Sequence, residues 1–171
     1  AIGLARLGHR VEVISRPRRI RTIEGVSTRV LQGLRQAGLA QAAGCASAPV
    51  PRHALWSGQP TQANVEQLLD REVFDRALLA DLADAGIRLH EARVVGIDSD
   101  AQGHRLQLDS GETLACDFLV DARGRQAPLA AGRTRGPETL SLVMHWDAPP
   151  GPGASGVEAG EDGWAWMARH P

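Results

Sequence analysis

The sequence of 171 residues contains no lysine and no tyrosine, so all 19 of its basic residues are arginine. Chemistry that needs a lysine ammonium, a Schiff base or a tyrosine hydroxyl is therefore excluded from this chain. The arginines are nearly balanced by 20 acidic residues, which argues against a nucleic-acid-binding protein, because such proteins need clustered positive charge. No apolar run approaches the ~18 residues of a membrane span.

Reactive and metal-binding side chains are also scarce. The two cysteines, Cys45 and Cys116, form no metal or redox motif, and no pair among the six histidines has metal-ligand spacing. We therefore expect no metal site and a reducing, cytoplasmic location. The chain begins without Met in what reads as the middle of a helix, so we expect it to be a piece of a longer protein.

Helices are expected over residues 1–7, 27–38 and 71–85. The last is the strongest because Phe74, Leu78 and Leu82 recur at helical spacing, behind Asp70 as a capping residue. Residues 40–64 contain several prolines and little periodicity, and we expect a loop there with a short strand at 53–56.

Short apolar or alternating runs predict strands over residues 11–14, 92–98, 104–109, 112–116, 118–120, 140–144 and 164–167. Turn signals join three of them into a β-meander, and the apolar run 118–120 is typical of a buried strand. A helix-to-strand unit with a meander that returns to a buried strand favours a dinucleotide-binding α/β domain with an inserted antiparallel piece.

Three segments resemble the FAD-dependent oxidoreductases of the aromatic hydroxylase, tryptophan halogenase and geranylgeranyl reductase superfamily. Residues 1–14 are similar to the helix and strand that follow the glycine-rich phosphate loop of these proteins. The segment DREVFDRALL at 70–79 resembles their D-R-x-x-F-D-x-x-L-L helix, and FLVDARGR at 118–125 resembles their D-A-T-G-R segment.

The resemblance implies a fold and a division of the chain. Residues 1–133 correspond to an incomplete Rossmann-like FAD-binding domain, in which the glycine-rich loop and the first strand are missing and the β-meander is inserted. Residues 134–171 correspond to the start of an antiparallel β region that binds substrate.

The resemblance implies FAD contacts for Ser15, Arg16, Arg21, Arg29, Arg71, Asp121, Gly124 and Arg125. Ser15 stands where the family has an acidic residue on the adenosine ribose, so its hydrogen bond lacks charge assistance. Arg16 either stacks on adenine or approaches phosphate, or is a solvated loop residue. Arg21 or Arg29 corresponds to the arginine that reaches the pyrophosphate, and a solvated position is the alternative for each.

Three of these positions follow from local physics as well as from the resemblance. Arg71 begins the strongest helix, where a cation opposes the helix dipole, so we expect a compensating anion: an FAD oxygen, or Asp75 one turn later. Asp121 and Gly124 follow the expected buried strand, at the edge where open α/β sheets bind ligands, and a plain turn is the alternative.

Gly163-Trp164-Ala165-Trp166 is similar to the W-x-W-x-I-P segment of flavin halogenases, which implies that Trp164 and Trp166 line the substrate cavity. Packing of these indoles on a core is the alternative. Halogenases of this family use a lysine, and its absence excludes halogenation.

Together these segments look closest to flavoproteins that hydroxylate tryptophan in a partner polypeptide. The implied function is that of an FAD-dependent monooxygenase acting on an aromatic or indole-like group, in a small molecule or in a partner polypeptide, with NAD(P)H as electron donor. No catalytic residue is assigned, because the demanding chemistry belongs to the cofactor. Two alternatives stay open: a flavin-dependent isoprenoid reductase, and a truncated, non-catalytic chain.

Overall fold

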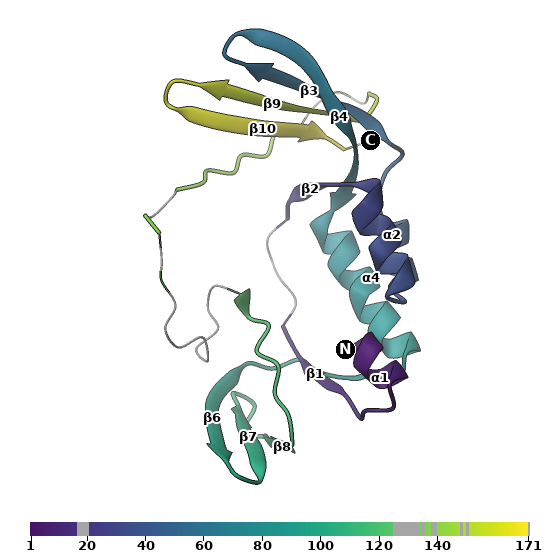
Figure 1. The fold of residues 1–171 in the computed structure, drawn as a ribbon, viewed down its shortest axis with the longest axis vertical. Helices are drawn as coiled ribbons and strands as arrows, with labels where there is room; N and C mark the ends of the chain where they lie inside the picture. Colours follow the sequence, from purple (N-terminus) through teal and green to yellow (C-terminus); the bar gives the residue numbers. More distant parts are fainter. Residues whose placement is uncertain are drawn as a thin grey trace. The chain divides into compact units, whose positions relative to one another are not determined.

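The computed structural model describes residues 1–16, 21–124, 134, 136–137, 140–147, 149 and 151–170. Two compact units make up the chain: residues 1–91 with 148–171, and residues 92–147. The fold is mixed α/β with several sheets, which confirms the α/β class (Figure 1). None of the described helices has the length and apolar character needed to cross a membrane.

The described part of the first unit contains helices α1 (Ile2–Arg6), α2 (Thr28–Gln36), α3 (Ala40–Gly44) and α4 (Arg71–Asp84). All three expected helices are present, and α3 is an addition. The Asp70 side chain accepts hydrogen bonds from the backbone N–H groups of Glu72 at 2.8 Å and Val73 at 3.4 Å, so the expected cap of α4 is confirmed.

Helix α3 is attached to α4 by a buried carboxylate. Asp81 of α4 is only 5% exposed and accepts hydrogen bonds from the backbone N–H groups of Gln41 at 3.0 Å and Ala42 at 2.9 Å. These N–H groups belong to the first turn of α3, where a helix has no internal acceptors. Asp81 therefore supplies the N-terminal cap of a helix that lies 40 residues earlier in the sequence.

A five-stranded sheet in the order β10-β9-β3-β4-β2 forms the other part of the first unit. Its strands are β2 (Ile23–Val26), β3 (Val50–Trp56), β4 (Gln59–Asp70), β9 (Ala154–Gly160) and β10 (Gly163–Arg169). Figure 1 shows β9 and β10 beside β3 and β4, which lie about a hundred residues earlier.

The expectation that residues 40–64 are mostly loop is wrong, since they contain α3, β3 and the first part of β4. The pairing of β3 with β9 is parallel and spans a long stretch of sequence, so no local periodicity reveals it.

A short parallel pair joins β1 (Glu12–Ile14) to β5 (Arg88–His90), with Glu12 opposite Arg88 and Ile14 opposite His90. The strand expected over 11–14 is thereby confirmed. Strand β5 follows α4 directly, and its three residues are too few to produce a sequence pattern.

The second unit contains the expected meander: β6 (Val94–Asp100), β7 (Gly103–Leu108) and β8 (Thr113–Cys116), antiparallel in that order. The strands expected over 118–120 and 140–144 are wrong, because the described residues there pair with no strand. Phe118 is 80% exposed and Leu140 is 85% exposed. An apolar run forms a buried strand only where a neighbouring strand receives its backbone hydrogen bonds.

Candidate functional site

A pocket of about 870 Å³ in the first unit brings together side chains from α1, β1, β5 and α4. Its apolar wall includes Leu78 and Leu82 of α4, and its polar groups include Ser15, Arg16 and Arg71. Three residues that the resemblance places on FAD therefore line one pocket, although Arg71 lies more than fifty residues after the other two. Arg21 and Arg29 are not among its lining residues.

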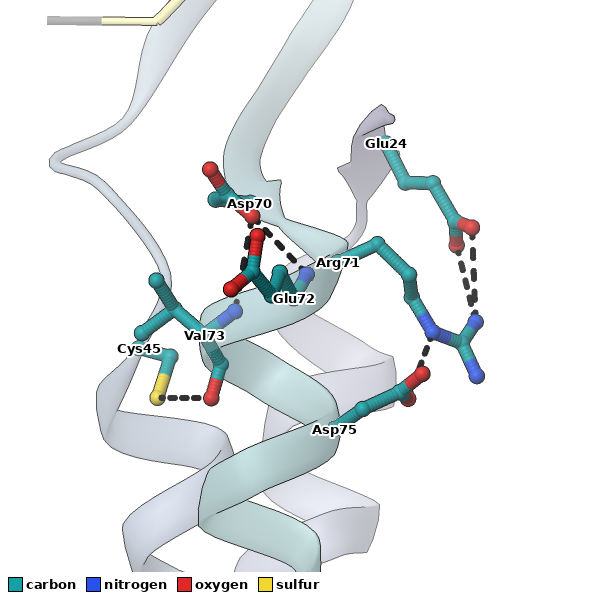
Figure 2. Close-up of polar contacts among 7 residues, drawn as sticks. All are labelled: Glu24, Cys45, Asp70, Arg71, Glu72, Val73 and Asp75. Atoms are coloured by element: carbon teal, nitrogen blue, oxygen red, sulfur yellow. Dashed lines mark hydrogen bonds and ion pairs between the residues drawn. The ribbon is translucent and has the colours of Figure 1, made fainter. Parts of the chain in front are cut away.

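Arg71 is held by two carboxylates, as Figure 2 shows. Its Nε donates a hydrogen bond to Asp75 Oδ1 at 2.7 Å, and its Nη1 lies 3.3 Å from both carboxylate oxygens of Glu24. The guanidinium also lies over the ring of Phe74, 5.5 Å from its centroid. Asp75 and Glu24 therefore supply the negative charge that a cation at the start of α4 requires.

These contacts set the charge state of Arg71. Desolvation by itself would lower the pKa of the guanidinium, but the hydrogen bonds and charges of Asp75 and Glu24 raise it above its ordinary value. Arg71 is therefore charged at every pH at which the protein is folded. Its side chain is 20% exposed, and its Nη2 has no hydrogen-bond partner among the described residues.

The residues of the pocket fit part of an FAD molecule. The free edge of the Arg71 guanidinium carries two N–H donors, which suit phosphate oxygens. The Ser15 hydroxyl suits a ribose hydroxyl, and the leucines of α4 provide an apolar surface for a ring. Ser15 lies at the carboxyl end of β1, where its N–H donates to the carbonyl of His90 at 3.0 Å.

A side-chain hydrogen bond connects β1 to β5. His90 Nε2 lies 2.7 Å from Glu12 Oε2, and the His90 side chain is 5% exposed. The hydrogen bond from His90 is the main reason why the pKa of Glu12 lies below its ordinary value; burial opposes it, and the charge of His90 adds to it. This hydrogen bond holds β1 and β5 together next to Ser15, which follows the last residue of β1.

Two other FAD candidates of the first unit, Arg21 and Arg29, do not line the pocket. Arg21 has an exposed side chain whose Nε is 3.7 Å from Asp70 Oδ2, and Arg29 is exposed in the first turn of α2. In the second unit the side chain of Asp121 is 7% exposed and accepts two hydrogen bonds at 2.8 Å from the guanidinium of Arg123.

The continuous run of described residues that contains Asp121 ends at Gly124. Gly124 has a φ of +61°, a left-handed conformation that favours glycine. Arg125 lies outside the described residues. The FAD contacts expected for Asp121, Gly124 and Arg125 therefore stay predictions.

Trp164 and Trp166 lie on β10, with side chains on one face of the five-stranded sheet. Trp164 is 69% exposed, whereas Trp166 is half-buried and its Nε1 donates a hydrogen bond to Glu66 Oε1 at 3.4 Å. Glu66 is 7% exposed and was missed by sequence reasoning. The only sequence feature that points to Glu66 is its position among the apolar residues of the segment 65–69, Val-Glu-Gln-Leu-Leu.

Metal and thiol chemistry have little support in the described residues. They contain no group of three His, Cys, Asp or Glu side chains placed to hold a metal ion. Cys45 and Cys116 are free, and burial raises the pKa of both thiols, so neither is an activated thiolate.

No protein-family model matches the chain, and comparison with curated proteins gives no match. Among solved structures the fold is that of part of a flavin-dependent monooxygenase. HpxO of Klebsiella pneumoniae, solved with FAD and uric acid, is 16% identical with a TM-score of 0.56, over 72% of this chain and 35% of its own. The tetrameric form of 2-methyl-3-hydroxypyridine-5-carboxylic acid oxygenase is 19% identical with a TM-score of 0.53, over 71% of this chain and 34% of its own.

A much stronger similarity points to one particular protein of this class. QhpG, a peptidyl tryptophan dihydroxylase essential for tryptophylquinone cofactor biogenesis, is 55% identical with a TM-score of 0.88 over 99% of this chain. The chain spans 39% of the length of QhpG. These comparisons confirm the resemblance to the FAD-dependent monooxygenases, including the branch that modifies tryptophan in a polypeptide.

Proposed function

We propose that the protein is an FAD-dependent monooxygenase that hydroxylates a tryptophan side chain in a partner polypeptide. The observation that carries the proposal is the 55% identity to QhpG over 99% of this chain. Since the chain spans 39% of QhpG, the proposal extends from the shared part to the activity of the whole protein.

The proposed FAD site lies in residues 1–133, as an incomplete Rossmann-like domain. Arg71 offers its free Nη2 to a phosphate or ribityl oxygen, while Asp75 and Glu24 hold the guanidinium in place. Ser15 binds the ribose beside Arg16. Further contacts are proposed for Arg21, Arg29, Asp121, Gly124 and Arg125. When bound, FAD supplies the oxygen-transfer chemistry, and the chain's residues orient the reactants and exclude water.

The proposed substrate region covers residues 134–171, with Trp164 and Trp166 as contacts for the aromatic group. The half-buried position of Trp166 and the exposed position of Trp164 support a surface on which a planar ring can stack. NAD(P)H is the proposed electron donor. The two unpaired cysteines favour a reducing, cytoplasmic location.

The test is to purify the full-length protein and record its absorption spectrum for bound flavin. We expect a yellow protein that oxidises NADH or NADPH and adds oxygen to a tryptophan-containing peptide, detected by mass spectrometry of the peptide. A colourless full-length protein that gains no flavin on addition of FAD would contradict the proposal and favour the non-catalytic alternative.

A further inference from the structure

Four polar side chains share one face of the five-stranded sheet: Arg52 of β3, Glu66 of β4, Ser155 of β9 and Trp166 of β10. Arg52 is the register partner of Ser155, and Val50, two residues before Arg52, is the partner of Glu66. Trp166 is the partner of Val157, two residues after Ser155. Residues two apart on a strand share a face. We call these four residues the sheet-face cluster.

Trp166 and Glu66 connect strands from opposite ends of the sheet. The Trp166 Nε1 donates to Glu66 Oε1 at 3.4 Å, although β9 and β3 lie between β10 and β4 in the strand order. Strand β10 also contacts β2, the strand beyond β4, so the sheet curls until its two outer strands approach each other. The sheet-face cluster lies on the concave side of this curl.

Two donors of the sheet-face cluster lack partners. Ser155 is 5% exposed, and neither its Oγ nor the buried Nε of Arg52 has a hydrogen-bond partner among the described residues. The Arg52 Nη1 is 3.9 Å from Glu66 Oε2, an ion pair too long to be a hydrogen bond. Buried donors in native proteins are almost always paired, so two adjacent exceptions point to a bound group.

The neighbouring charge limits what that group can be. Both unpartnered groups can donate a hydrogen bond, so they require an acceptor oxygen. Arg52 and Glu66 already balance each other's charge, so a carboxylate bound here would leave the cluster with a net negative charge beside the buried Glu66. A neutral carbonyl group keeps this balance, and an N–H on the same group would find an acceptor in Glu66. A peptide amide has both groups.

We propose that the sheet-face cluster is a binding subsite for a backbone amide of the polypeptide substrate. The amide carbonyl accepts hydrogen bonds from Ser155 Oγ and Arg52 Nε, and the amide N–H donates to Glu66 in place of the Trp166 indole. The long bond between Trp166 and Glu66 is weak enough to be exchanged in this way. This inference rests on the proposed function and adds the means by which a tryptophan in a polypeptide is distinguished from free tryptophan, whose carboxylate would leave the Arg52–Glu66 pair with a net negative charge.

The test measures binding to the flavin-loaded, full-length protein by calorimetry. The probes are N-acetyl-L-tryptophan methylamide, which has peptide amides, and 3-methylindole and L-tryptophan, which have none. We expect the wild-type protein to bind the methylamide about tenfold more tightly than either comparison compound, as one to two hydrogen bonds provide.

The deciding variant is Ser155→Ala. It should raise the melting temperature, because it removes a buried hydroxyl without a partner, and lower the affinity for the methylamide about five- to tenfold with no change for 3-methylindole. Ser110→Ala is the matched control, since Ser110 is exposed in the second unit and its Oγ accepts from the N–H of Glu112. It should change neither affinity.

Each result has a defined meaning. Equal affinities of the wild-type protein for the three probes would overturn the inference. So would a Ser155→Ala protein that melts at a higher temperature and still binds the methylamide as the wild type does. Both results leave the proposed function standing if the protein is yellow and oxidises the peptide. A colourless protein removes the proposed function instead.

Discussion

Two arginine–carboxylate clusters in the first unit differ in how completely their groups are paired. Arg71 has hydrogen-bond contacts at 2.7 Å to Asp75 and 3.3 Å to Glu24. Arg52 lies 3.9 Å from Glu66 and leaves a buried Nε without a partner in the described residues. In the first cluster short contacts to Nε and Nη1 hold the guanidinium in one orientation and leave Nη2 for a ligand, whereas in the second a buried Nε has no partner.

The difference has its origin in the local backbone. Arg71 and Asp75 are one helical turn apart on α4, the spacing at which two such side chains meet directly. On the sheet, Glu66 is the partner of Val50 and not of Arg52, so the charged groups meet diagonally and at a greater distance. The helical spacing thus produces a short ion pair between Arg71 and Asp75, and the register of the sheet produces a long one between Arg52 and Glu66.

The largest expected effect comes from removing Arg71, the cation of the first cluster, in the full-length protein. Arg71→Ala should lose a charge-assisted hydrogen bond to FAD of ~1.5–3 kcal/mol, about 10- to 150-fold in affinity. It also leaves the carboxylates of Asp75 and Glu24 without their shared cation. Arg76→Ala is the control, because Arg76 is an exposed arginine lining the same pocket. Titration of both apo-proteins with FAD measures the effect, and equal affinities would show that Arg71 only pairs with Asp75.

The buried carboxylate of Asp81 differs from those of both arginine clusters, because its partners are backbone N–H groups. Asp81→Ala should lower the free energy of unfolding by about 1–3 kcal/mol, since two backbone donors of α3 become unpaired in a buried position. Asp84→Ala removes an exposed contact to Gln41 Nε2 and should change stability by less than about 0.5 kcal/mol. Chemical denaturation of the two variants measures both values. Similar losses would mean that Asp81 contributes no more than a surface contact.

The elements with local signals could be predicted from the sequence. Helix α4 was predicted because Asp70 caps it and Phe74, Leu78 and Leu82 recur on one face, and the meander because turn residues separate its strands. Asp75 was predicted as one possible partner of Arg71 from helical spacing alone, and that ion pair is present.

The elements that depend on distant partners could be predicted only in part. The short strand expected at 53–56 lies within β3, but the full strand exists because β4 and β9 pair with it, and its own sequence gives no clear alternation. The reverse error occurred at Phe118, where an apolar run predicted a strand that nothing in the described residues pairs with. Glu66 and Asp81 were missed because each is defined by a partner on another element, and a single buried carboxylate produces no periodic pattern.

Neutralising one carboxylate in each cluster tests the contrast directly. Asp75→Asn should lower the free energy of unfolding by about 1 kcal/mol, because it removes the charge from a 2.7 Å hydrogen bond between partly buried groups. Glu66→Gln should change it by less than about 0.5 kcal/mol or raise it, since a buried charge with only long contacts is costly to keep. Denaturation at neutral pH measures both. A larger loss of unfolding free energy for Glu66→Gln than for Asp75→Asn would mean that the charge of Glu66 stabilises the fold.

The smallest effect concerns the hydrogen-bonded pair of Glu12 and His90. The pKa of Glu12 is lowered mainly by its hydrogen bond to His90, so this carboxylate stabilises the folded state above its ordinary pKa of 4.5. That stability is lost as the pH falls through the lowered pKa of the folded state, because both states then bind the same proton. Since the Glu12 side chain is 36% exposed, solvent screening limits the contribution to less than about 1 kcal/mol.

Comparison of the wild-type protein with Glu12→Gln at two pH values checks this expectation. At neutral pH the variant should be less stable by that small amount, and at about pH 3 the difference should shrink, because the wild-type carboxylate is then becoming protonated as well. High salt at neutral pH should reduce the difference in the same direction, since the pair is partly exposed. A difference that stays constant with pH would mean that Glu12 acts through its neutral hydrogen bond to His90 and not through its charge.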